Sequence, residues 1–121
     1  MPRRLLKMAA IHGFAAVAVG AFAAHALKSR LEPEALGWVE TGARYQMYHG
    51  LALLGLAALA DKFGEDRLKW AGLGFFWGAL IFSSSLYALA LGGPRWLGAL
   101  TPLGGLGMLG GWLILFLAFR S

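Results

Sequence analysis

The chain contains no cysteine and few charged residues. Charged residues make up 14% of its 121 residues, whereas soluble domains have about 25%. The absence of cysteine excludes disulfides, thiolate metal sites and a cysteine nucleophile. All six carboxylates lie between the apolar segments, so none is placed within those segments as an acid or base. Nucleophile-elbow, P-loop and HExxH motifs are also missing. We therefore expect a protein without a catalytic site.

Hydrophobic residues are abundant instead, at 59% of the sequence. A soluble protein of this size could not bury so much apolar surface, so the lipid bilayer must cover part of it. Four apolar segments are each close to the ~20 residues that a helix needs to cross a bilayer. We predict an all-α integral membrane protein with one domain, residues 1–121, and four transmembrane helices. The predicted spans are residues 5–27, 43–60, 68–91 and 97–119.

The first segment has an alternative interpretation as a cleaved signal peptide. It begins with basic residues (Arg3, Arg4 and Lys7), and the sequence Ala21-Phe22-Ala23 fits an A-x-A cleavage site. However, its apolar stretch is longer than the usual core of a signal peptide. We therefore favour an uncleaved first helix.

The connection between the first two spans contains a helix signal of its own. Pro33 lies between two glutamates, which is typical of the first turn of a helix. Apolar residues then recur at helical spacing from Leu36, and Trp38 suits a membrane interface. We predict a short interfacial helix before the second span, able to continue into it through Gly42. A solvated loop is the alternative.

Basic residues predict the orientation. Seven lysines and arginines fall on the side of the two termini and four on the other side, which favours cytoplasmic termini. The net charge of +5 does not indicate nucleic-acid binding, because the basic residues are scattered at segment ends without interleaved aromatic residues.

Glycine is the other abundant residue, at 18 positions. Small residues recur at every fourth position in several segments, a spacing that lets helix backbones approach closely in membranes. We expect tight packing within the bundle. The alternative is a homo-oligomer that forms through Gly74, Gly78, Gly107 and Gly111.

Polar side chains gather at one depth of the predicted bundle. Antiparallel spans place seven of them in the non-cytoplasmic half: His25, Tyr45, Gln46, His49, Ser84, Tyr87 and Thr101. Hydrogen bonds between helices would explain each one singly. Their convergence favours a pocket that binds a lipid headgroup or a small polar solute. His12 falls about 10 Å from the cytoplasmic end. Histidines without nearby carboxylates indicate neither a metal nor a cofactor site.

Three stretches of sequence carry a resemblance to a known family. Residues 20–28 read GAFAAHALK, residues 45–49 read YQMYH, and residues 82–87 read FSSSLY, followed by TPLGG at 101–105 and Gly111-Trp112. The chain resembles the bacterial membrane family called domain of unknown function 423, relatives of the eukaryotic transmembrane protein 256. Ala23 departs from a glycine that is usual in the family. The resemblance implies a four-helix protein of the bacterial inner membrane, with family motifs on His25, Gln46, His49, Ser83, Tyr87 and Thr101.

Two further classes of function stay open. A membrane scaffold or assembly factor would act through the glycine-rich helix faces. A small transporter or channel subunit is less favoured, because the chain is short and the second half of the second span is purely apolar.

Overall fold

A computed structural model describes residues 3–119 of the chain, and within them it contains helices and no strand. The four long helices are α1 (Arg3–Phe22), α2 (Pro33–Phe63), α3 (Glu65–Ala90) and α4 (Leu100–Ala118). A π-helical turn (Ala23–Leu27) extends α1, and a 3-10 helix (Arg95–Ala99) precedes α4. The predicted all-α fold with four helices is therefore confirmed.

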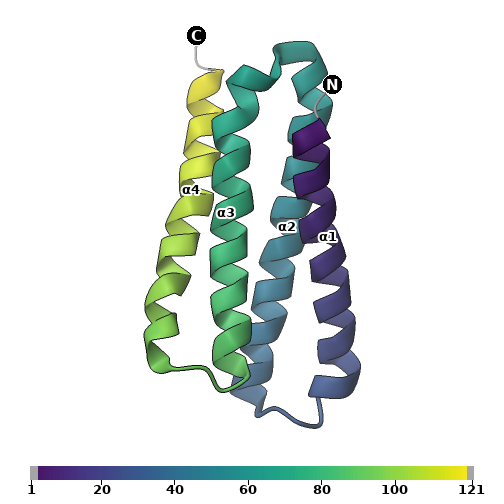
Figure 1. Ribbon diagram of the computed structural model, residues 1–121, viewed down its shortest axis with the longest axis vertical. Coiled ribbons are helices and arrows are strands. Elements are labelled where there is room, and N and C mark those ends of the chain that lie inside the picture. The colour runs from purple at the N-terminus through teal and green to yellow at the C-terminus, as the bar shows by residue number, and fades with distance from the viewer. Residues whose placement is uncertain (1–2, 120–121) are drawn as a thin grey trace.

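The helices lie side by side in chain order and alternate in direction (Figure 1). Each packs mainly on its neighbours in sequence, so α1 and α4 form opposite edges of the bundle (Figure 1). α1 begins and α4 ends at the same end of the molecule. Glycines with positive φ form two of the turns, Gly64 (90°) between α2 and α3 and Gly92 (96°) after α3.

Three of the helical segments are long and apolar enough to cross a membrane. They are Arg3–Leu27, Glu65–Ala90 and Arg95–Ala118. α2 is not among them, because it carries Arg44, Gln46 and His49 near its middle and Asp61 near its end. At 1.5 Å per residue its 31 residues extend about 46 Å.

The helix predicted to start at Pro33 does start there, after Glu32. It does not form a separate short helix, because it continues without a break through Gly42 to Phe63 as α2. The alternative of a solvated loop is wrong for this segment. Its place at a membrane interface stays a prediction.

The apolar core has two parts. The larger one lies toward the start of α1 and includes Leu53, Leu68 and Phe75, which are all fully buried. A smaller one near the opposite end surrounds Ala23 and Val39.

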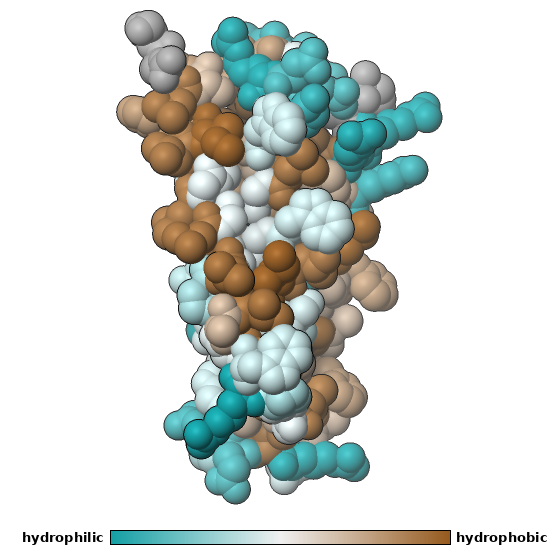
Figure 2. Space-filling model, turned by 60° about the vertical axis from the view of Figure 1, so that its left-hand side comes forward, coloured by the Kyte–Doolittle hydropathy of each residue, from teal (hydrophilic) through white to brown (hydrophobic). Residues whose placement is uncertain are grey.

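The outside of the bundle is apolar over most of its length. Figure 2 shows hydrophilic residues gathered at the two ends of one face, with hydrophobic residues between them. Phe14 of α1 and Phe116 of α4 are the most exposed large hydrophobic side chains among the described residues, at 80% and 73%. A band of this kind is typical of a surface that meets lipid.

Glycines bring the backbones of α3 and α4 together. A Cβ added at Gly78 would lie 2.5 Å from the Met108 nitrogen, and one at Gly74 would lie 2.9 Å from the Gly107 oxygen. Gly111 approaches the backbone of Ala71 in the same way. The expected tight packing within the bundle is confirmed here. The four glycines named for a homo-oligomer therefore face each other or the neighbouring helix of the same chain.

Candidate functional site

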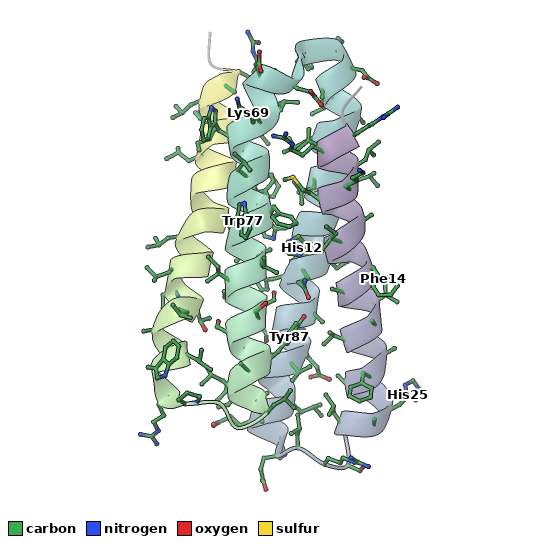
Figure 3. The ribbon with its side chains drawn as sticks, viewed as in Figure 1. His12, Phe14, His25, Lys69, Trp77 and Tyr87 are labelled. Atoms are coloured by element: carbon green, nitrogen blue, oxygen red, sulfur yellow. The ribbon has the colours of Figure 1, made fainter. Side chains whose placement is uncertain are left out.

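A chain of hydrogen bonds joins the first three helices at their middle. Nε2 of His12, on α1, lies 2.9 Å from the Phe76 carbonyl oxygen of α3. Nε2 of Gln46, on α2, lies 2.9 Å from Nδ1 of His12. The Tyr87 hydroxyl of α3 donates to Oε1 of Gln46 at 2.7 Å. We call His12, Gln46 and Tyr87 the central network; the view in Figure 3 labels its two ends, His12 and Tyr87.

The donor and acceptor roles in the central network follow from its fixed ends. A carbonyl oxygen only accepts, so Nε2 of His12 carries a proton and donates to Phe76. Nδ1 is then the acceptor of a neutral imidazole, and the amide NH₂ of Gln46 donates to it. This leaves the amide oxygen of Gln46 free to accept from Tyr87. Each side-chain nitrogen and oxygen of the central network is therefore either a donor or an acceptor, and the imidazole of His12 is neutral.

A second set of bonds connects α2 to α4 through His49. Its Nδ1 lies 3.0 Å from the Tyr45 carbonyl oxygen and therefore carries the proton. Its Nε2 accepts from the indole N–H of Trp112 at 3.1 Å. His49 is thus the opposite tautomer of His12, and the ring of Phe75 packs against both His49 and Trp112.

Gly42 on α2 supports the central network in two ways. Its carbonyl oxygen accepts from the Ser83 hydroxyl at 2.7 Å. A Cβ at this position would lie 2.6 Å from Cε1 of Tyr87, so only glycine leaves space for the tyrosine ring. The ring can then extend along α2 until its hydroxyl reaches Gln46.

A third contact joins α3 to the first turn of α4. The Ser85 hydroxyl donates to the Phe82 carbonyl oxygen at 2.8 Å, and the Thr101 hydroxyl lies 2.6 Å from Ser85 Oγ. Since the proton of Ser85 is already given to Phe82, Thr101 is the donor in the second bond.

The structure brings together only some of the residues that the sequence placed in one pocket. Gln46 bonds to Tyr87, whereas His49 and Thr101 bond to separate partners. Tyr45 contributes its backbone carbonyl oxygen, while its half-exposed ring packs against Phe82.

His25 and Ser84 are not brought to these groups. Nδ1 of His25 bonds to the Ala21 carbonyl oxygen of its own helix at 2.8 Å, and its exposed ring projects away from Tyr87 (Figure 3). Ser84 is exposed on α3.

Sequence reasoning missed four members of the site. His12 is fully buried at the centre of the bundle, although it was placed apart from Gln46. Trp112, Ser83 and Ser85 were seen only as parts of sequence motifs. The central network also lies nearer the middle of the bundle than expected, because α2 is one helix that starts at Pro33, ten residues before residue 43, where the second span was predicted to begin.

The buried polar groups form a closed polar core, by which we mean that their donors and acceptors bond within the protein. No buried side-chain nitrogen or oxygen among residues 3–119 lacks a hydrogen-bond partner. In the same residues, no three His, Asp or Glu side chains are grouped where they could hold a metal ion. Chemically, such an arrangement holds helices in place, since its donors and acceptors are already used by one another.

These features define a class, that of a small helical membrane protein with a closed polar core. The chain belongs to the family described as "Protein of unknown function (DUF423)", whose sequence profile matches residues 19–105. The resemblance read from the three sequence stretches is therefore confirmed.

Relatives from several bacteria match nearly the whole chain. It is 41% identical over 113 residues to the "UPF0382 inner membrane protein YgdD" of Escherichia coli (strain K12), covering 93% of this chain and 86% of the relative. It is 45% identical over 125 residues to a "UPF0382 membrane protein" of Haemophilus influenzae, covering 100% and 98%. A "UPF0382 membrane protein" of Staphylococcus epidermidis is 41% identical over 111 residues, covering 92% and 90%. No solved structure matches the chain.

Proposed function

We propose that the chain is a non-enzymatic binding protein of the bacterial inner membrane that crosses it four times, with both termini in the cytoplasm. Relatives that are named membrane or inner membrane proteins support the location. α2 supplies the fourth span in this proposal. Its packing between α1 and α3, two helices that are long and apolar enough to cross, supports this placement.

One observation carries the non-enzymatic part of the proposal. Every buried side-chain nitrogen and oxygen among residues 3–119 has a hydrogen-bond partner, which favours a structural role for these groups over acid–base or nucleophilic chemistry. Gln46 uses its NH₂ for His12 and its oxygen for Tyr87. In lipid, bonds of this kind hold helices together, typically for ~0.6 kcal/mol each and up to ~1.7. The central network therefore serves packing, and binding takes place on the surface of the bundle.

The geometry favours a lipid over a small polar solute as the ligand. A polar solute at Gln46 would have to break two existing hydrogen bonds, whereas a lipid can bind at the outer surface. A scaffold acting through the glycines of α3 and α4 has less support, since those faces pack within the chain. A channel or transporter also has less support, because bonded side chains fill the middle of the bundle.

Two experiments test this proposal. Alkaline phosphatase fused after Arg30 or Gly93 should be active outside the cytoplasm, and green fluorescent protein fused after Gly64 or Ser121 should fluoresce inside it. The reverse pattern, or a pattern that requires three spans, would overturn the topology.

Native mass spectrometry tests the role of the central network. A ligand retained by the wild type in a gentle detergent should also be retained by a folded Gln46→Leu variant. Loss of that ligand, with helix content unchanged by circular dichroism, would show instead that Gln46 binds it.

A further inference from the structure

A cleft of about 390 Å³ lies between the first turns of α1 and α3. Its volume is in the range of small-molecule sites, ~300–1,000 Å³. Arg3 and Arg4 line one wall and Lys69 the other, while Leu5, Met8 and Leu73 form the apolar part. Figure 3 shows Lys69 on α3 near the end of the bundle where α1 begins.

The electrostatics of this cleft favour an anion. Three cationic side chains meet two acidic ones, Glu65 and Asp66, so the balance of formal charge is 3 − 2 = +1. α1 and α3 both begin here, and the positive ends of their dipoles add to the attraction. Glu65 and Asp66 occupy the first turn of α3, where they already stabilise that helix.

The apolar residues of the cleft lie deeper in the bundle than its cationic residues. Met8 lies four residues below Arg4 on α1, and Leu73 lies four residues below Lys69 on α3, which is about 6 Å in each case. Leu5 closes the floor, where it packs so near Gly72 that a Cβ there would lie 2.6 Å from its Cδ2. Cationic groups at the rim and apolar groups toward the membrane match the two parts of a phospholipid.

We propose that this cleft binds an anionic phospholipid, with the phosphate between the two helices and the upper acyl chain against Met8 and Leu73. The inference deepens the proposed lipid binding by naming the site and the headgroup charge. A soluble phosphate would use the cations and leave the apolar floor without a partner. A zwitterionic lipid would bring its own cation against Arg3, Arg4 and Lys69.

The test compares lipids that differ only in the headgroup. The intact protein in a gentle detergent is titrated with phosphatidylglycerol or phosphatidylethanolamine of the same acyl chains, and adducts are counted by native mass spectrometry. We expect phosphatidylglycerol to bind about tenfold better, a preference that two cations near the lipid phosphate can supply. Equal binding of the two lipids would overturn the proposal.

Matched variants locate the site. Arg4→Gln with Lys69→Gln should reduce the preference to about twofold or less, because the formal charge of the side chains that line the cleft then changes from +1 to 1 − 2 = −1. Lys28→Gln with Arg95→Gln removes two exposed cations at the other end of the bundle and should keep it. An equal loss in both double variants, or no loss in the first, would contradict the inference. Circular dichroism confirms that each variant is folded, and Lys69→Glu serves as a second cleft variant.

Competition separates lipid from free phosphate. Millimolar inorganic phosphate or glycerol phosphate should leave the phosphatidylglycerol adduct in place. Complete displacement by either would show a site for soluble phosphate and overturn the lipid assignment. Because detergent-solubilised protein has no sidedness, these outcomes do not depend on the proposed topology, which the fusion experiments test alone.

Discussion

Replacing Gln46 with leucine should destabilise the protein without disturbing its shape. Gln46 is 4% exposed and bonds to His12 at 2.9 Å and to Tyr87 at 2.7 Å. Leucine has a similar volume, so the substitution removes polar contacts and leaves little cavity. Nδ1 of His12 and the Tyr87 hydroxyl would then be buried without a partner.

The size of the effect follows from the two lost bonds. Interhelical hydrogen bonds in membranes contribute ~0.6 kcal/mol on average and up to ~1.7. Two bonds therefore give about 1.2 kcal/mol as the lower figure and about 3.4 as the upper one. We expect the free energy of unfolding to fall by about 1–3 kcal/mol.

The measurement is reversible unfolding in mixed detergent micelles, with sodium dodecyl sulfate as denaturant and circular dichroism as the signal. Ser84→Ala is the matched control, because Ser84 is a polar residue of α3 that is exposed and outside the central network. If Gln46→Leu costs no more than Ser84→Ala, the hydrogen bonds of Gln46 do not stabilise the bundle.

A double-mutant cycle tests the bond between Gln46 and Tyr87 directly. Tyr87→Phe removes only the hydroxyl that donates to Gln46. The double variant should be more stable than the sum of the two single losses predicts, by about 0.5–1.7 kcal/mol. Strict additivity would mean that the bond contributes nothing.

Two further substitutions test the packing of α4 in the same unfolding assay. Gly78→Val should cost at least about 2 kcal/mol, because its Cβ would meet the α4 backbone, whereas Gly55→Val on the exposed face of α2 should cost far less. Equal losses would show that valine acts only through helix propensity. Trp112→Phe keeps an aromatic ring but removes the donor to His49, so it should cost about 0.5–2 kcal/mol, and a loss near zero would show that this bond does not hold α4.

Most of the fold could be predicted from the sequence, because its signals are local. An apolar segment of bilayer length predicts a helix, and glycine in a short connection predicts a turn, without information from distant parts of the chain. The helix start at Pro33 could also be predicted. Whether this helix ends early or continues could not be decided from the sequence, because no break in the sequence marks an end before Phe63, where α2 ends.

What could be predicted of the site depended on the residue from which depth along the second helix was counted. Counted from residue 43, Gln46 lies near the end of a span, far in depth from His12. Counted from the connection itself, Gln46 lies 46 − 33 = 13 residues after the start of α2, and His12 lies 27 − 12 = 15 residues before Leu27. Antiparallel helices joined by a short turn place such positions at similar depth. The pairing of His12 with Gln46 could therefore have been predicted from the sequence.

Trp112 could not be placed in this way. Depth alone puts it near His49, but a hydrogen bond also needs the face of α4 that bears it to turn toward α2. That rotation follows from the packing of Gly107 and Gly111 on α3, which depends on atoms far apart in the sequence. Likewise, the sequence did not show that His25 lies in a π-helical turn with its side chain exposed.

Glycines and polar side chains contribute in different ways to the packing of α4 on its neighbours. A face of small residues repeating every fourth position lets α3 and α4 approach closely, yet a shift by one turn, 5.4 Å, would again set glycine against glycine. Lipid supplies no hydrophobic drive between helices that would penalise the shifted arrangement. The bonds from Thr101 to Ser85 and from Trp112 to His49 do penalise it, since a shift would break both and leave polar groups without partners. The glycines thus make the contact close, and the polar side chains make its register unique.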